Sequence, residues 1–197
     1  MNTLVFAVLG YFLGSLPFAV IVSRAFGLAD PRTFGSGNPG ATNVLRSGNK
    51  LAALLTLLGD AAKGWLAMMR AAALGADAAG SAVAGVAAFL GHVFPVVLKF
   101  RGGKGVATAL GVLIGLDGTI AALVAATWLA VAAASRYSSL AAIAAACVAP
   151  TLALQKFGVG AISSAVIGMC LLLLWRHRSN IANLAAGTEG GIGGKKG

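Results

Sequence analysis

Residues 4–22 read LVFAVLGYFLGSLPFAVIV, an apolar stretch without a charged side chain. Its length is close to the roughly 20 residues that an α-helix needs to cross the hydrocarbon core of a bilayer. No basic segment precedes it, as one would in a cleaved secretory signal, and more apolar stretches follow it. We therefore expect residues 4–25 to form the first of several retained transmembrane helices.

Composition extends this expectation to the whole chain. Apolar residues make up 58% of its 197 residues and charged residues only 10%, whereas a soluble domain carries about 25% charged residues. The fold class that we predict is an all-α polytopic membrane protein, a compact bundle of about seven transmembrane helices. Their expected positions are 4–25, 51–72, 80–99, 105–116, 118–134, 139–155 and 158–175.

The shorter apolar stretches leave one alternative for the helix count. If 105–134 and 139–175 each formed one continuous helix, the bundle would have five spans. Either number is odd, so the two chain ends would lie on opposite faces. We expect residues 1–189 to form a single transmembrane domain and residues 190–197 to be a mobile C-terminal tail.

The positive charge of the chain is unevenly distributed. The formal net charge is +10, and most Lys and Arg residues stand in short loops between apolar stretches, which argues against a nucleic-acid partner. With seven spans and the N-terminus outside, every Lys and Arg of the chain except Lys63, Arg70 and Lys156 falls on the inner side, in agreement with the positive-inside rule. This pattern predicts an outside N-terminus, a cytoplasmic C-terminus and polar loops that share the cytoplasmic face.

Two charged residues lie within a predicted span. Asp60 and Lys63 are three residues apart, so they share a helix face and can pair. Charged groups in a span usually face the bundle interior, where this pair could either lock helix packing or form the floor of a site. Cys147 and Cys170 lie in apolar stretches, and we expect packing residues rather than a disulfide or a metal site.

Three polar segments between the apolar stretches are the candidates for chemistry. The first, residues 34–46, reads FGSGNPGATNVLR. Its glycines would allow backbone N–H groups to face an anion without a Cβ in the way, and its arginine offers a planar fork that suits phosphate. The alternative is an ordinary turn-rich connector. The candidate residues are Gly35, Ser36, Gly37, Asn38 and Arg46.

The second segment joins GHVFP at 91–95 to KFRGGKGVAT at 99–108. Gly102, Gly103, Lys104 and Gly105 come directly before a predicted helix, so backbone donors, the helix N-terminus and the lysine could converge on an anion. The order is not that of a Walker A motif, because a glycine follows the lysine, and we do not infer nucleotide hydrolysis. His92 is more simply a hydrogen-bonded packing residue.

The third segment reads WRHRSNIANL at 175–184 and GTE at 187–189. His177 and Asn180 are three residues apart and could share a face of a helical turn, although the neighbouring arginines would equally suit a basic tail. In the seven-span arrangement the loop at 136–139 returns to the same face. Ser139 would then either cap a helix or add a wall to a binding site.

Together the three segments resemble the signature segments of the bacterial membrane-bound acyl-phosphate:glycerol-3-phosphate acyltransferases, the PlsY family. The matching stretches are GSGNPGATNVLR at 35–46, GHVFPVVLKFRGGKGVAT at 91–108 and RHRSNIANLAAGTE at 176–189. The resemblance implies transfer of the acyl group of acyl phosphate to the sn-1 hydroxyl of glycerol 3-phosphate, which yields lysophosphatidic acid and inorganic phosphate. It also implies a multi-pass inner-membrane enzyme of phospholipid biosynthesis that needs no acyl-CoA, cofactor or metal and that has a functional link to an enzyme forming acyl phosphate.

The implied reaction asks for little covalent chemistry from the protein. Acyl phosphate is already an activated mixed anhydride, so the enzyme has to hold two anions together and stabilise the developing oxyanion. We expect direct transfer without an acyl-enzyme, with either His177 or a phosphate oxygen of a substrate as the base. The candidate catalytic residues are His177, Asn180 and Ser36, and the candidate substrate-binding residues are Gly35, Gly37, Asn38, Arg46, Gly102, Gly103, Lys104, Gly105 and Ser139.

Two other functions compete with this interpretation. An acyltransferase with an H-x-x-x-x-D dyad is excluded, because Val97 and Ala182 stand five residues after the two histidines. A small membrane transporter for an organic phosphate is the remaining alternative, since an intramembrane ion pair and interrupted helices would suit it. Against it, the polar residues cluster in loops on one face instead of near the middle of the membrane.

Overall fold

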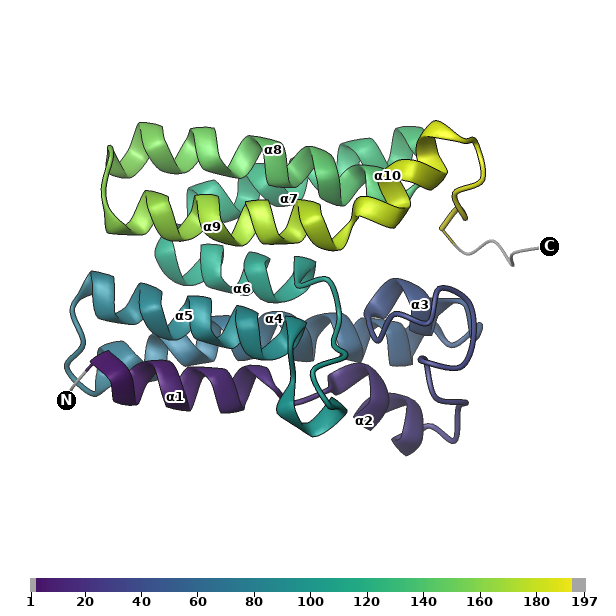
Figure 1. Cartoon of the computed structure of the whole chain (residues 1–197), viewed down its shortest axis with the longest axis horizontal. Coiled ribbons are helices and arrows are strands. Elements are labelled where there is room, and N and C mark those ends of the chain that lie inside the picture. Colours follow the sequence, from purple (N-terminus) through teal and green to yellow (C-terminus); the bar gives the residue numbers. More distant parts are fainter. Residues whose placement is uncertain (1–2, 193–197) are drawn as a thin grey trace.

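The computed structural model describes residues 3–192, which are helical and contain no strand. This confirms the predicted all-α fold. The helices, drawn in Figure 1, are α1 (Thr3–Gly14), α2 (Phe18–Ala25), α3 (Ala41–Leu45), α4 (Lys50–Ala73), α5 (Ala78–Val93), the 3-10 turn η1 (Val96–Leu98), α6 (Val106–Leu116), α7 (Gly118–Ser135), α8 (Ser138–Phe157), α9 (Ala161–Arg176) and α10 (Arg178–Ala185).

The helices form two groups that lie side by side along the long axis of the molecule (Figure 1). In the N-terminal group, α1 packs on α5, and α4 packs on both α5 and α6. In the C-terminal group, α8 lies between α7 and α9. Helix α6 contacts α4, α5 and α7, so it joins the two groups.

Seven apolar segments lie near the predicted positions, with two corrections. The helix expected over 4–25 is interrupted at 15–17, where Pro17 precedes α2, and the helix expected over 80–99 ends at Val93 and is followed by η1. Five are long enough to cross a membrane, and two shorter apolar helices, α6 and α9, accompany them. The five long segments are Thr3–Ala25, Lys50–Ala73, Ala78–Leu98, Gly118–Ser135 and Ser138–Phe157. The chain is therefore a polytopic membrane protein.

The two continuous helices of the five-span alternative are not present. Helix α6 ends at Asp117, whose side chain caps the start of α7 by accepting from the Ile120 N–H at 2.9 Å. Lys156, at the end of α8, lies 3.2 Å from Asp117. The chain thus reverses at 117 and again after 157, and it keeps the four segments separate.

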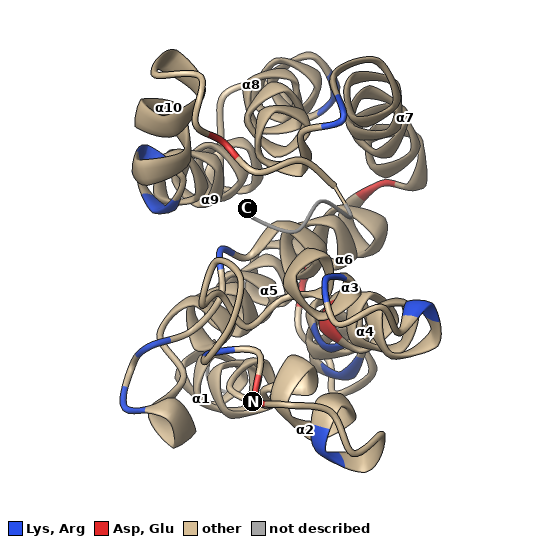
Figure 2. Cartoon of the chain, turned by 90° about the vertical axis from the view of Figure 1, so that its right-hand side faces the viewer, with Lys and Arg blue, Asp and Glu red and all other residues tan. Residues whose placement is uncertain are grey.

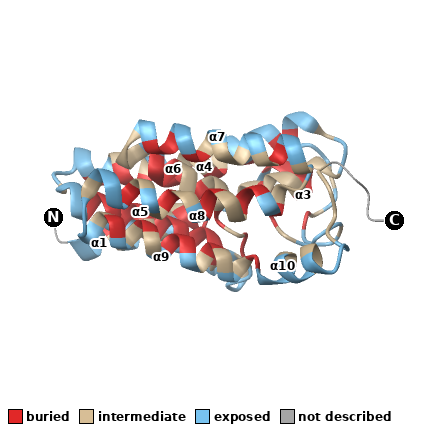
Figure 3. Ribbon diagram, turned by 90° about the horizontal axis from the view of Figure 1, so that it is seen from above, coloured by how far each residue is buried: buried red, intermediate tan, exposed pale blue. Residues whose placement is uncertain are grey.

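Small residues allow the helices to approach closely. A Cβ on Gly14 would lie 2.0 Å from the Ala88 carbonyl oxygen, and one on Gly111 would lie 1.9 Å from that of Ala61. Such contacts are typical of helix packing in membranes, where small residues bring backbones together. Buried residues run along the middle of the bundle, and exposed apolar side chains cover its outer faces (Figure 3).

The first and third polar segments lie toward the right-hand end of the bundle in Figure 1, and the second lies beside them, nearer the middle. Two hydrogen bonds join the second segment to the third: Arg176 Nη2 donates to the Gly102 carbonyl at 3.0 Å, and Lys104 Nζ donates to Asn180 Oδ1. The first segment contacts neighbouring residues outside the other two: Thr42 Oγ1 lies 2.9 Å from Ser138 Oγ, and Arg46 Nη2 donates weakly to the carbonyl of residue 190 at 3.5 Å. Within the expected tail, the N–H of residue 192 also donates to the carbonyl of residue 136 at 2.8 Å. Residues 193–197 lie outside the described residues, so the mobility of the tail stays a prediction.

Candidate active site

An open cleft of about 1470 Å³ lies at this end of the bundle and connects two different environments. Its polar end is lined by residues of all three polar segments, and its other end runs between α6, α7, α8 and α9. That second part is lined by apolar side chains, among them Leu110, Leu113, Val124, Trp128 and Leu173. A ligand with a charged head and an alkyl tail fits such a cleft.

Asn43 organises the first polar segment. This buried side chain donates through Nδ2 to the carbonyls of Pro31 (2.6 Å) and Phe34 (3.1 Å), and its Oδ1 accepts from the Ser36 N–H at 3.1 Å. Gly35 is needed beside it, because its φ is +57° and a Cβ would lie 2.3 Å from Asn43 Oδ1. The segment thereby presents the exposed Ser36 side chain to the cleft.

Arg46 closes the other end of the same segment. Its Nη1 donates to Asn43 Oδ1 at 3.4 Å, a long contact, and among the described residues its buried Nε has no hydrogen-bond partner. Arg176 has an unpartnered buried Nε as well within residues 3–192. Buried guanidinium donors are normally satisfied, so both side chains keep capacity for an acidic ligand in the cleft, which both of them line.

The backbone N–H groups that we expected to face an anion instead donate hydrogen bonds to backbone carbonyls within the protein. The N–H of Gly102 donates to the Val93 carbonyl at 3.2 Å, and that of Gly103 donates to the His92 carbonyl at 3.1 Å. The N–H of Gly37 is also used within its own loop. The expectation that Gly37, Gly102 and Gly103 supply free backbone donors is wrong. At Gly102 and Gly103 the reason is that the last carbonyl groups of α5 lack helical partners and accept hydrogen bonds from the turn.

These two glycines are instead required by close contact. A Cβ on Gly102 would lie 2.1 Å from the His92 carbonyl oxygen, and one on Gly103 would lie 2.2 Å from His92 Nε2. Gly105 begins α6 with a φ of +88°, a backbone conformation that favours glycine. The turn therefore holds Lys104 at the start of α6, where a helix N-terminus also favours an anion.

Lys104 donates from Nζ to Asn180 Oδ1 across the cleft. Burial lowers the pKa of Lys104 to about 8, although the Glu189 carboxylate opposes this shift, and the charges of Arg176 and Arg46 add to it. The ammonium group is thus still charged at neutral pH. Lys104 thus lies within the influence of two further cations and one carboxylate, so this part of the cleft carries an excess of positive charge. Figure 2 views this end along the bundle, with Lys and Arg on both helix groups.

His177 stands between α9 and α10 and is buried. Its Nδ1 lies 2.9 Å from the Leu173 carbonyl, which can only accept, so Nδ1 carries the proton and Nε2 keeps its lone pair. Burial lowers the pKa of His177 to about 4, in spite of the hydrogen bond to Leu173. A neutral ring with so low a pKa is a weak proton acceptor.

Glu189 was quoted in the third segment but was not assigned to the predicted site. Its Oε1 accepts from Ser139 Oγ and from Asn180 Nδ2, both at 2.7 Å. Partial burial raises the pKa of Glu189, but these hydrogen bonds outweigh burial and hold the pKa below its usual value. Ser139 does not cap α8, since Tyr137 occupies the N-cap position, so its hydroxyl serves the site network.

The structure brings most of the predicted site residues to one cleft. Gly35 and Gly103 lie behind its wall, packed on Asn43 and His92. Sequence reasoning missed Asn43, Arg176 and Glu189; all three stood inside the quoted segments, but their roles depend on contacts between segments. The predicted residues that line the cleft are Ser36, Gly37, Asn38, Arg46, Gly102, Lys104, Gly105, Ser139, His177 and Asn180.

Fold and cleft together define a polytopic membrane protein with a positively charged cleft that opens onto an apolar crevice. The model of the glycerol-3-phosphate acyltransferase family matches residues 4–187. The glycerol-3-phosphate acyltransferase of Ralstonia nicotianae is 58% identical over 98% of this chain and 96% of its own length. That of Laribacter hongkongensis is 59% identical over 100% of this chain and 99% of its own length. The chain belongs to the glycerol-3-phosphate acyltransferase family.

Two solved structures share the fold over nearly the whole chain. Both are crystal structures of PlsY (YgiH), described as an integral membrane glycerol 3-phosphate acyltransferase. The glycerol 3-phosphate form has a TM-score of 0.90 and 34% sequence identity, covering 98% of this chain and 96% of that one. The lysophosphatidic acid form has a TM-score of 0.88 and 33% identity, covering 97% and 95%.

Proposed function

We propose that this protein transfers the acyl group of acyl phosphate to the sn-1 hydroxyl of glycerol 3-phosphate. The products are 1-acylglycerol 3-phosphate (lysophosphatidic acid) and inorganic phosphate. Membership of the glycerol-3-phosphate acyltransferase family supports the acceptor. The resemblance of the three polar segments to the PlsY family supports the donor.

The observation that carries the proposal is the composition of the cleft. Its polar end is lined by Arg46, Lys104 and Arg176 together with Glu189, and both proposed substrates bring a phosphate to be neutralised. Its apolar end has room for an alkyl chain, which the donor and the product both carry. Holding two anions at one point supplies most of the catalysis that an activated donor needs.

In the proposed reaction the sn-1 oxygen attacks the carbonyl carbon of acyl phosphate, and the new C–O ester bond replaces the bond to phosphate. The leaving phosphate takes the electron pair of the broken bond, and the hydroxyl proton ends on a phosphate oxygen. A phosphate oxygen is the better base because the pKa of His177 is about 4. His177 Nε2 would accept the hydroxyl hydrogen bond and orient the nucleophile.

The remaining site residues receive binding and orienting roles. Lys104 and the two arginines would bind the phosphates through charge-assisted hydrogen bonds. Asn180 keeps its Oδ1 toward Lys104 because its Nδ2 is engaged by Glu189. Ser36 and Asn38 line the opposite wall and would position a substrate headgroup. Direct transfer requires no covalent acyl-enzyme at Ser36.

The proposed setting is the bacterial inner membrane, with the N-terminus outside and the cleft at the cytoplasmic face. The distribution of Lys and Arg over the loops supports this orientation. The enzyme would serve phospholipid biosynthesis and would depend on an acyl-phosphate-forming enzyme for its donor. The apolar crevice allows the donor chain to enter from the bilayer.

The test is a donor comparison with detergent-purified protein, with phosphate and lipid products both measured. We expect phosphate release from acyl phosphate that requires glycerol 3-phosphate, and no lysophosphatidic acid from acyl-CoA. Equal rates with acyl-CoA would overturn the proposed donor. Uptake of glycerol 3-phosphate into sealed proteoliposomes without any lipid product would instead establish the transporter.

A further inference from the structure

A buried ionic cluster lies directly behind the turn that carries Lys104. Lys63 Nζ lies 2.8 Å from Asp60 Oδ1, and His92 Nδ1 lies 3.3 Å from the same oxygen. All three side chains are buried, and Lys63 is only 1% exposed. Removing charges from water is costly unless their geometry is well satisfied, and the proposed reaction uses none of the three residues.

His92 connects this cluster to the turn in two ways. Its carbonyl accepts from the Gly103 N–H at 3.1 Å, and its ring lies so close that a Cβ on Gly103 would be 2.2 Å from Nε2. The side chains of Asp60, Lys63 and His92 line one small cavity together with Gly103. The position of the His92 ring therefore limits where the backbone just before Lys104 can lie.

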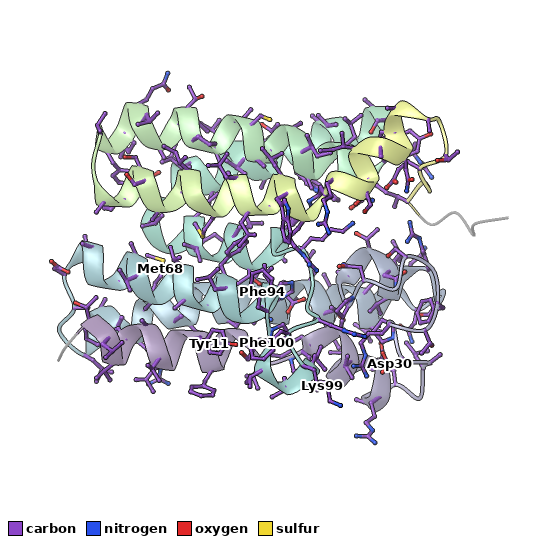
Figure 4. All side chains as sticks on the ribbon, in the orientation of Figure 1. Tyr11, Asp30, Met68, Phe94, Lys99 and Phe100 are labelled. Atoms are coloured by element: carbon purple, nitrogen blue, oxygen red, sulfur yellow. The ribbon has the colours of Figure 1, made fainter. Side chains whose placement is uncertain are left out.

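The cluster also joins three membrane helices at the level of the turn. Lys63 Nζ donates to the Leu16 carbonyl at 2.9 Å, beside the break between α1 and α2. Tyr11 Oη of α1 donates to the Phe94 carbonyl at 2.7 Å, two residues after His92; Figure 4 labels both residues. Helices α1, α4 and α5 are thus tied together at the base of the 94–105 loop.

The charges of the cluster fix the orientation of the histidine ring. Lys63 already balances the Asp60 carboxylate, so a neutral His92 with its Nδ1 3.3 Å from Asp60 Oδ1 leaves the cluster without net charge. A carboxylate on one ring nitrogen sets the tautomer and the angle of an imidazole. In this orientation the ring presents Nε2 to Gly103.

We propose that Asp60, Lys63 and His92 are positioning residues that hold the 102–104 turn so that Lys104 reaches the substrate phosphate. This inference rests on the proposed function and assigns a role within the same site. Asp60 and His92 also reach the wall of the large cleft, but the proposed role of all three residues is to position Lys104. Substitution of these residues should weaken the binding of glycerol 3-phosphate in a protein that still folds.

The experiment is a double-mutant cycle between the cluster and Lys104. One cluster variant, Asp60→Leu/Lys63→Met, removes both charges together, which avoids an unpaired buried ion. The other, His92→Gln, leaves the Asp60–Lys63 pair in place. Each cluster variant is made alone and in combination with Lys104→Ala, and KM for glycerol 3-phosphate, kcat and the melting temperature are measured. The control is Lys156→Gln, which removes the ion pair with Asp117 at the far end of the bundle.

We expect both cluster variants to raise KM for glycerol 3-phosphate by roughly three- to thirtyfold, as coupled residues of one network do, and to cause no further rise once Lys104 is alanine. The control should leave KM unchanged. The inference is overturned by a wild-type KM in a folded cluster variant, or by effects that simply multiply with that of Lys104→Ala. If Asp60→Leu/Lys63→Met fails to fold, the cycle between His92→Gln and Lys104→Ala decides alone. An inactive wild-type protein in the same assay would refute the proposed function instead.

Discussion

Lys104 is the site residue whose charge is most sensitive to pH. Because burial lowers its pKa to about 8 against the opposing effect of Glu189, the free protein carries this cation below pH 8 and loses it above. The value of kcat/KM reports ionisations of the free enzyme. We predict that kcat/KM for glycerol 3-phosphate falls about tenfold per pH unit above pH 8. Initial rates at subsaturating acceptor across pH 6.5–9.5 measure this.

Lys104→Arg is the matched control for that profile. A guanidinium group stays protonated to above about pH 12, so the alkaline fall should move out of the measured range even if the absolute rate is lower. An alkaline fall that is identical in the variant would mean that another group causes it.

Glu189 makes a second prediction at the residue scale. In Glu189→Gln the amide oxygen can still accept from Ser139 and Asn180, which both donate to Oε1, but the negative charge that strengthens the two hydrogen bonds is lost. Hydrogen bonds to charged groups contribute about 1.5–3 kcal/mol, and kcat/KM should fall roughly ten- to hundredfold. Ser139→Ala removes one of the two bonds and should have the smaller effect. A larger effect for Ser139→Ala would place the hydroxyl, rather than the carboxylate, at the centre of the network.

At the scale of elements, the contact between α4 and α6 depends on a missing side chain. Gly111→Ala would place a methyl group 1.9 Å from the Ala61 carbonyl oxygen. Overpacking of this kind costs about 1–3 kcal/mol. We predict a clearly lower melting temperature in detergent for this variant.

Gly168→Ala provides the comparison within another helix interior. An added Cβ meets nothing within 4 Å at this position of α9. Because alanine is favoured over glycine inside a helix, Gly168→Ala should leave the melting temperature unchanged or raise it. Equal destabilisation by both substitutions would argue against the close α4–α6 packing.

The elements also show what the sequence can and cannot predict. The apolar stretches located the helices, and Asp117 marked the reversal between α6 and α7, because hydropathy and capping are local properties. The function of Gly102 and Gly103 was misjudged, since a glycine that donates to a ligand and one that makes room for His92 look identical in sequence. Glu189 was missed because its place in the cleft depends on hydrogen bonds from Ser139 and Asn180, which the sequence does not reveal.

At the scale of the whole molecule, the three polar segments share one end of the bundle, and we predict that this end faces the cytoplasm. Single cysteines would be introduced at Ser47, Ser179 and Val159 after replacement of Cys147 and Cys170. Val159 lies in the α8–α9 turn at the other end and is 96% exposed. In intact cells an impermeant thiol reagent should label position 159 but neither of the other two. The reverse labelling pattern would invert the orientation.

The central claim is that this cleft binds and joins two phosphate-bearing substrates. The most direct test measures kcat/KM for glycerol 3-phosphate in Lys104→Ala and Arg46→Ala, with Lys156→Ala, a lysine at the opposite end of the bundle, as control. Loss of a charge-assisted contact to a partly desolvated anion should cost each site variant about 2–4 kcal/mol, or roughly 30- to 1,000-fold, while the control stays within about twofold of wild type. Near wild-type values for both site variants, or an equal loss in the control, would contradict the account.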